Sequence, residues 1–182
     1  MAQIGSSGQP TDRQIAELLA LDPDEAVNLF RKLSKPPNDF AGEFRGHVPN
    51  YLRDEWSVLM KESGLGTWLG KGFLAEKHGE YLGHGYNIYS NNGKIHRQLE
   101  FAWSFENSEL DECPALIMYY RAFTNWAGKR DLIDEIRMVA PGIFLGLFHT
   151  REAVPHFTRP GSERSAVGFF LLESKTLLGD PI

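Results

Sequence analysis

The 182-residue sequence has little cysteine, no long apolar run and no concentrated stretch of basic residues. Cys113 is the only cysteine, so an internal disulfide is excluded, and its acidic neighbours argue against a reactive thiol. No apolar run approaches the roughly 20 residues that cross a bilayer, and the first residues show no secretory signal. We therefore expect a cytoplasmic protein without a membrane span.

The sequence also lacks the motifs that commonly carry chemistry. It has 19 Lys and Arg against 24 Asp and Glu, a net charge of −5, and no basic run for nucleic acid. No histidine pair has HExxH or HxH spacing, so we expect no metal. No G-x-G-x-x-G, Walker or G-x-S-x-G pattern occurs, which leaves no sign of a nucleotide cofactor or a hydrolase nucleophile. No cofactor is expected.

What the chain does contain is 12% aromatic residues and 18 glycines, a balance that favours β-sheet. The first 38 residues differ from the rest and are predicted to form a disordered start followed by a helical segment. Thr11 and Asp22 are the expected helix N-caps, with Glu25 completing a capping box at the second. We interpret these helices as a lid or plug on the domain formed by residues 39–182.

From residue 40 onward, short alternating stretches separated by turn signals predict strands. In 98–106 the residues Leu99, Phe101, Trp103 and Phe105 share one face, and a turn at 91–93 predicts a hairpin with the strand 81–89. Further strands are expected at 115–123, within 134–152 and at 166–174, whereas 49–64 fits a helix or a long loop. The predicted fold class is mostly β (α+β), an antiparallel up-and-down barrel with a short helical N-terminal segment.

Three copies of glycine-x-aromatic-x-glycine support a barrel. They are Gly42/Phe44/Gly46, Gly66/Trp68/Gly70 and Gly142/Phe144/Gly146. Residues two apart on a strand share a face, so each ring is expected to lie over its own glycines at a bend of the coiled sheet. Abundance of both residue types is the alternative explanation.

A family resemblance rests on "GEFRG", "GTWLGKGF" and "DLIDEIRMVAPGIFLG". Together they resemble the bacterial domain named for its GxWxG motif, over about residues 24–150, although Phe44 stands where that family usually has tryptophan. The resemblance implies a lipocalin-like β-barrel with a central cavity. The family has no settled activity, so the resemblance implies a class of ligand and no reaction.

A ligand-holding barrel is lined by apolar side chains and a few polar groups. The residues expected to bind the ligand are Phe44, Trp68, Tyr86, Phe101, Trp103, Phe105, Phe144 and Phe148. The residues expected to act in catalysis are His84, Tyr120, Arg121 and His149. Histidine and tyrosine would exchange protons and arginine would stabilise negative charge. Each of these residues could instead be plain core or surface, and the pattern leaves open whether Tyr119 or Tyr120 points inward.

The first functional hypothesis is an enzyme that acts on a small, largely apolar molecule, a cofactor-independent isomerase or lyase using acid/base chemistry. The second is a non-catalytic, lipocalin-like carrier or sensor of a fatty acid, terpenoid or aromatic compound. The third is an interaction module with a fully packed barrel. An apolar edge or the N-terminal helices offer surface for a homodimer. The sequence does not decide whether the protein is an enzyme.

Overall fold

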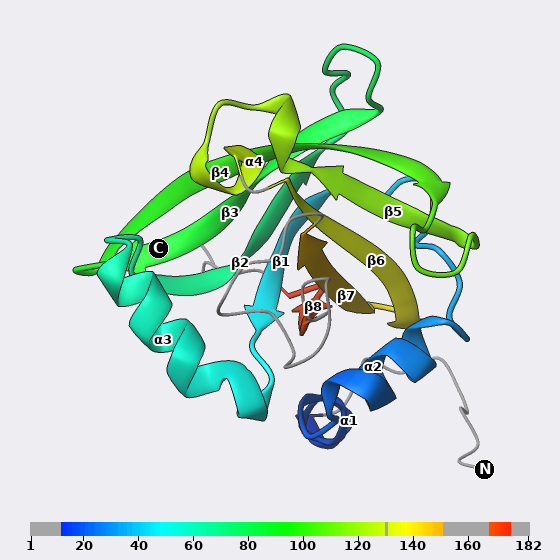
Figure 1. The fold of residues 1–182 in the computed structure, drawn as a ribbon, viewed down its shortest axis with the longest axis horizontal. Helices are drawn as coiled ribbons and strands as arrows, with labels where there is room; N and C mark the ends of the chain where they lie inside the picture. The colour runs from blue at the N-terminus through cyan, green and yellow to red at the C-terminus, as the bar shows by residue number, and fades with distance from the viewer. Residues whose placement is uncertain (1–11, 130, 151–167, 176–182) are drawn as a thin grey trace.

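A computed structural model of the chain shows a closed antiparallel β-barrel of eight strands, described over residues 12–129, 131–150 and 168–175 (Figure 1). The strands are β1 (Gly42–His47), β2 (Thr67–Leu74), β3 (Gly83–Asn91), β4 (Lys94–Asn107), β5 (Pro114–Tyr119), β6 (Leu132–Ala140), β7 (Ile143–Thr150) and β8 (Gly168–Glu173). The helices are α1 (Asp12–Leu19), α2 (Pro23–Phe30), α3 (Arg53–Glu62) and α4 (Trp126–Lys129), with 3₁₀ turns η1 (Asn50–Leu52) and η2 (Tyr120–Ala122).

The strands follow one another around the barrel in sequence order, and β1 closes it by pairing with β8. This confirms the predicted mostly β, up-and-down antiparallel barrel. The hairpin between β3 and β4 is also confirmed, and its turn residues Asn92 and Gly93 both have positive φ, as a tight hairpin turn requires. The segment predicted as helix or loop forms η1 and α3.

Aromatic rings do cover glycines, but the predicted pairing within each triplet is wrong. The ring nearest to Gly46 is that of Trp68 on β2, and the ring nearest to Gly146 is that of Phe170 on β8. Gly168 is covered in the same way by Phe148 on β7. Each of these rings covers a glycine on a neighbouring strand. Residues that pair across two strands point to the same face of the sheet, and they lie closer together than residues two apart on one strand.

Helices α1 and α2 pack on the outer face of the barrel, so they do not plug its interior. Ile15, Leu18, Ala26 and Phe30 join the outward-facing residues of β5 to β8 in one apolar cluster. The capping box of α2 is present, with the Asp22 carboxylate accepting from the Glu25 backbone N–H at 2.8 Å. The other expected cap, Thr11, lies outside the described residues.

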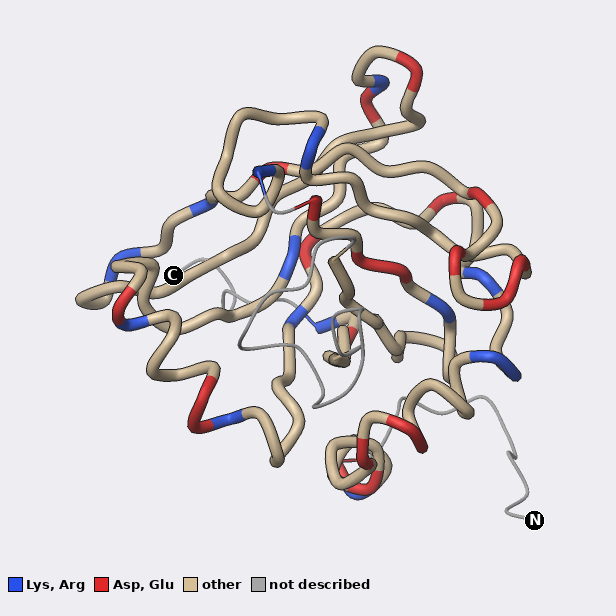
Figure 2. The backbone as a smooth tube through the Cα atoms, viewed as in Figure 1, with Lys and Arg blue, Asp and Glu red and all other residues tan. Residues whose placement is uncertain are grey.

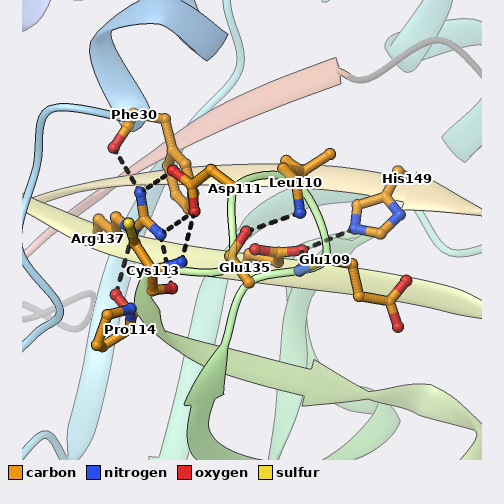
Figure 3. A network of polar contacts seen from close by, with 10 residues as sticks. Phe30, Glu109, Leu110, Asp111, Cys113, Pro114, Glu135, Arg137 and His149 are labelled. Carbon is orange, nitrogen blue, oxygen red and sulfur yellow. Dashed lines mark hydrogen bonds and ion pairs between the residues drawn. The ribbon is translucent and has the colours of Figure 1, made fainter.

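Arg137 on β6 fastens α2 to the barrel (Figure 3). Its fully buried guanidinium donates to the Phe30 carbonyl at 3.0 Å and to both carboxylate oxygens of Asp111 at 2.6 and 2.7 Å. It also donates to the carbonyls of Cys113 and Pro114. All its donors are used, as a buried charge requires.

The interior has a closed half and an open half. In the closed half, the ring of Phe40 stacks on the ring of Phe44, with 4.5 Å between the two ring centroids. Phe40 also contacts the rings of Phe73 and Phe144 edge-on, so aromatic rings fill this half. Helix α3 lies on a different side of the barrel from α1 and α2 (Figure 1), and its residues Trp56, Leu59 and Met60 pack against the open half.

Charged residues are spread over many elements of the described chain, with both signs interspersed (Figure 2). Among the described helices, none has the length and apolar character to cross a membrane.

The cross-strand pairs give a stability prediction. A methyl group on Gly146 would lie 2.1 Å from the Phe170 ring, which is buried and packs against Trp68. We expect Gly146→Ala to lower the free energy of unfolding by about 1–3 kcal/mol, measured by urea denaturation. In Gly146→Ala/Phe170→Leu the smaller side chain leaves room for the methyl group, so the double variant should lose less than the sum of the single variants. Simple additivity would contradict the proposed packing.

Candidate functional site

The open half of the barrel contains an apolar pocket with a polar floor. Leu52, Trp56 and Leu59 line it from the η1–α3 segment, and Trp68, Phe148 and Phe170 line it from the barrel. Its free space of about 70 Å³ exceeds what a single water needs, roughly 10–15 Å³ on this measure. It accommodates a small molecule or one end of a larger molecule.

The floor of the pocket holds a buried ion pair. Lys71 Nζ on β2 lies 2.8 Å from Asp134 Oδ2 on β6, and both side chains are only 3% exposed. The three ammonium hydrogens have three acceptors, namely Asp134, the Asn87 Oδ1 atom at 2.8 Å and the Tyr120 hydroxyl at 2.6 Å. The rings of Phe101 and Phe170 lie 5.2 and 5.1 Å from Nζ. These contacts replace the water that the ammonium group loses on burial.

The neighbours of the pair hold one another in place. The Tyr120 hydroxyl donates to Asp134 Oδ2 at 2.9 Å and accepts from Asn87 Nδ2 at 3.0 Å. Asn87 also accepts from the Trp68 indole N–H at 3.1 Å and donates to the Leu99 carbonyl. Each polar group therefore has its position fixed by at least one other, which limits the orientations open to Asp134.

A β-bulge brings Lys71 inside the barrel. The register between β2 and β3 shifts between Trp68 and Gly70, so Trp68 and Lys71 both face inward although they are three residues apart. Gly70 fits this bulge because its φ is +149° and a Cβ there would lie 2.0 Å from the Phe44 carbonyl oxygen. Strict alternation from Trp68 would have placed Lys71 in solvent.

Two buried polar atoms in this region have no hydrogen-bond partner in the described part of the chain. They are Asp134 Oδ1 and the Trp56 indole N–H. Both residues line the pocket, as does Tyr89, whose hydroxyl is a further donor. An unpaired buried polar group raises the free energy of the folded protein, so such groups often mark a place where a ligand completes the hydrogen bonding.

Burial alters the acidity of this cluster. Loss of hydration lowers the pKa of the Lys71 ammonium, and Asp134 opposes that shift. Burial raises the pKa of Tyr120 well above its ordinary value, with the Asp134 charge adding to the effect. The same two causes raise the pKa of Tyr89. Both phenols are thus neutral hydrogen-bond donors at physiological pH.

Three of the predicted residues line the pocket: Tyr120, Trp68 and Phe148. The open choice between two tyrosines is resolved, since Tyr120 points inward from η2 while Tyr119 packs in the outer cluster. The remaining predicted rings of the interior belong to the packed core instead of the pocket wall. They are Phe44, Phe101, Trp103, Phe105 and Phe144.

The other predicted residues lie away from the pocket. His84 and Tyr86 share the outer face of β3, where His84 Nδ1 lies 3.1 Å from the Glu76 carbonyl oxygen and the Tyr86 hydroxyl donates to Glu43. Arg121 is half exposed and lies 3.7 Å from Asp131. The structure does not bring these residues together with Tyr120.

His149 is buried, but on the outer side of β7. Its Nε2 lies 3.0 Å from Glu135 Oε1, which also accepts from the Glu109 backbone N–H (Figure 3). The neighbouring inward residues Phe148 and Asp134 face the pocket, so alternation places His149 and Glu135 on the opposite side of the barrel wall.

The sequence interpretation missed Lys71, Asn87, Tyr89 and Asp134. Asp134 lies in the charged stretch "DLIDEIR", whose pattern gives no sign that its side chain is buried, and the bulge places Lys71 inside against strict alternation. On β3 the inward face carries Gly83, Gly85, Asn87 and Tyr89, so it reads as less apolar than the outward face. The described residues contain no group of three or more His, Cys, Asp or Glu that could hold a metal ion.

The ion pair predicts strongly coupled mutations. Lys71→Met leaves Asp134 buried without its cation, and we expect a loss of about 3–5 kcal/mol in unfolding free energy. Asp134→Leu should cost a similar amount because it strands the ammonium group. In denaturant unfolding, the double variant Lys71→Met/Asp134→Leu should lose less unfolding free energy than the sum of the losses of the two single variants. Independent, additive losses would show that the two charges do not interact.

The tyrosine environment predicts a spectroscopic result. Unfolded tyrosine ionises near pH 10, whereas the raised pKa values keep Tyr89 and Tyr120 protonated in the folded protein. At about pH 11 the folded protein should show less phenolate absorbance at 295 nm than the chain unfolded in guanidinium. Tyr89→Phe should lower the absorbance of the unfolded chain and leave that of the folded protein unchanged. A matching decrease in the folded protein would contradict burial of Tyr89.

Comparison with known proteins gives no relative from which a function could be transferred. No family model matches the sequence, no curated protein matches it, and no solved structure matches the fold. The function has to be argued from the geometry of the pocket.

Proposed function

We propose that the barrel binds a small, largely apolar molecule in the pocket and acts on it as a cofactor-independent acid/base isomerase or lyase. The observation that carries the proposal is the unpaired Asp134 Oδ1 beside a buried ion pair in an apolar cavity. Apolar binding alone needs no buried charges, which are costly to desolvate. Buried ionisable clusters in a cleft are common at catalytic sites.

In this proposal Asp134 is the base. Its Oδ1 takes a proton from the bound molecule, while Oδ2 remains held by Lys71 and Tyr120. The same carboxyl group returns the proton to a different atom, so the reaction is a balanced isomerisation. Tyr89 and Trp56 supply hydrogen bonds to an oxygen on which negative charge develops. Lys71 stays paired as an ammonium group because each of its hydrogens has an acceptor.

Tyr120 has a different role from the one expected from sequence. Its proton is committed to Asp134 and its pKa is raised, both of which disfavour proton donation to a ligand. We assign it, with Asn87, to the positioning of Asp134. The acid/base and charge-stabilising roles expected for His84, Arg121 and His149 are assigned instead to Asp134, Tyr89 and Trp56.

The barrel architecture supports a lipocalin-like assignment. Small eight-stranded barrels hold one small ligand in their interior, and here the pocket opens in one half of the barrel. The segments that resemble the GxWxG domain contribute directly to the pocket. "GTWLGKGF" supplies Trp68 and Lys71, and "DLIDEIR" supplies Asp134.

Proton transfer can be tested with cyclohexanone, a small neutral ketone with exchangeable hydrogens. In D₂O, the wild-type protein should accelerate the loss of its α-hydrogen signals in ¹H NMR spectra. Asp134→Asn should reduce this rate by about 10²–10⁴-fold, the usual contribution of a general base. His84→Ala and His149→Ala are matched controls outside the pocket and should retain the rate. Circular dichroism would verify that each variant is folded.

Other outcomes would favour the other hypotheses. Binding of cyclohexanone, seen as chemical-shift changes of pocket residues, without accelerated exchange would favour a carrier or sensor. Exchange that survives in Asp134→Asn would contradict the role of this carboxylate. Native mass spectrometry of gently purified protein provides an independent check, since a co-purified small molecule would show that the pocket is occupied.

A further inference from the structure

The polar groups of the pocket also restrict the charge of its ligand. Among the residues that the structure describes, Lys71 is the only cationic side chain that lines it, and its three hydrogens are committed to Asp134, Asn87 and Tyr120. The unpaired acceptor, Asp134 Oδ1, belongs to a carboxylate. A second carboxylate placed beside it would be repelled and would find no free cation among the described residues of the wall.

The unpaired groups suit a hydroxyl group. A ligand O–H can donate to Asp134 Oδ1, and its oxygen can accept from a neutral donor. The Tyr89 hydroxyl is such a donor, and Tyr89 lines the same pocket as Asp134. The Trp56 indole N–H offers a second donor from α3. A hydroxyl both donates and accepts, whereas a carboxylate only accepts and a hydrocarbon does neither.

The rest of the pocket is made of rings and aliphatic side chains, and its free space is about 70 Å³. The part of the ligand that enters must therefore be compact and apolar. We propose that the ligand is a small neutral alcohol or phenol, with its hydroxyl group at Asp134 and Tyr89, and that fatty acids and other carboxylates are excluded. This inference rests on the proposed function for the existence of a ligand and adds its chemical class.

Three ligands of similar size separate the contributions of a hydroxyl group, an apolar ring and a carboxylate to binding. Phenol carries the hydroxyl group, toluene replaces it with a methyl group of similar volume, and benzoate replaces it with a carboxylate. Each would be titrated into the full chain and followed by ¹H–¹⁵N NMR spectroscopy. We expect phenol to bind at least about threefold more tightly than toluene, the value of one or two net hydrogen bonds. Benzoate should cause no saturable shifts at the pocket.

Conservative variants identify the contacts. Tyr89→Phe and Trp56→Phe each remove one donor of the pocket wall and keep an aromatic ring, and within the described residues neither change breaks a hydrogen bond. Each should reduce the preference for phenol over toluene, by roughly 2- to 10-fold for Tyr89→Phe. Tyr86→Phe is the control, because it removes a hydroxyl from the same strand on the outer face of the barrel.

The outcomes distinguish this inference from the proposed function. Toluene or benzoate binding as tightly as phenol would overturn the inference while leaving a ligand-binding pocket. Phenol preference that depends on Tyr89, together with no exchange of cyclohexanone, would support the inference and contradict catalysis. If none of the three ligands binds, both proposals fail and the packed interaction module becomes the better hypothesis.

Discussion

Two opposite charges inside an apolar barrel impose the constraint on which the rest of the interior depends. Lys71 and Asp134 are buried away from water and form an ion pair with each other. Asp134 accepts only one of the three ammonium hydrogens of Lys71, so the other two need further acceptors. Asn87 and Tyr120 meet that need, and Trp68 is drawn in through its bond to Asn87. The pocket lies beside this arrangement, and Lys71, Asn87, Tyr120 and Asp134 all line it.

The two faces of strand β6 have different functions. Asp134 and Ile136 point inward to the pocket and core, whereas Glu135 and Arg137 point outward. The outward pair ties α2 and the loop after β4 to the barrel wall, so the strand that presents Asp134 is held from behind. Alternation along one strand thereby links a rigid support to the group that meets the ligand.

The barrel was predictable because its strands alternate and its turns are marked by glycine and asparagine. Residues 98–106 and the turn at 91–93 show this directly. The pocket was only partly predictable. Large rings on strand-like segments identified three of its residues, Trp68, Tyr120 and Phe148. Strict alternation from Trp68 would predict an outward-facing Lys71, but the bulge after Trp68 turns Lys71 inward. Pairing between distant strands, such as Lys71 with Asp134, has no local signal in a single sequence.

The closure of the barrel by β1 and β8 has a consequence for synthesis on the ribosome. Gly46 pairs with Leu172, so the first strand has no partner on one edge until the segment around residue 172 has been made. Until then β1 presents open backbone groups that another nascent chain can join. Its short length and the charged Glu43 and Arg45 make such pairing unfavourable. The barrel thus protects its earliest edge during the interval before its last strand emerges.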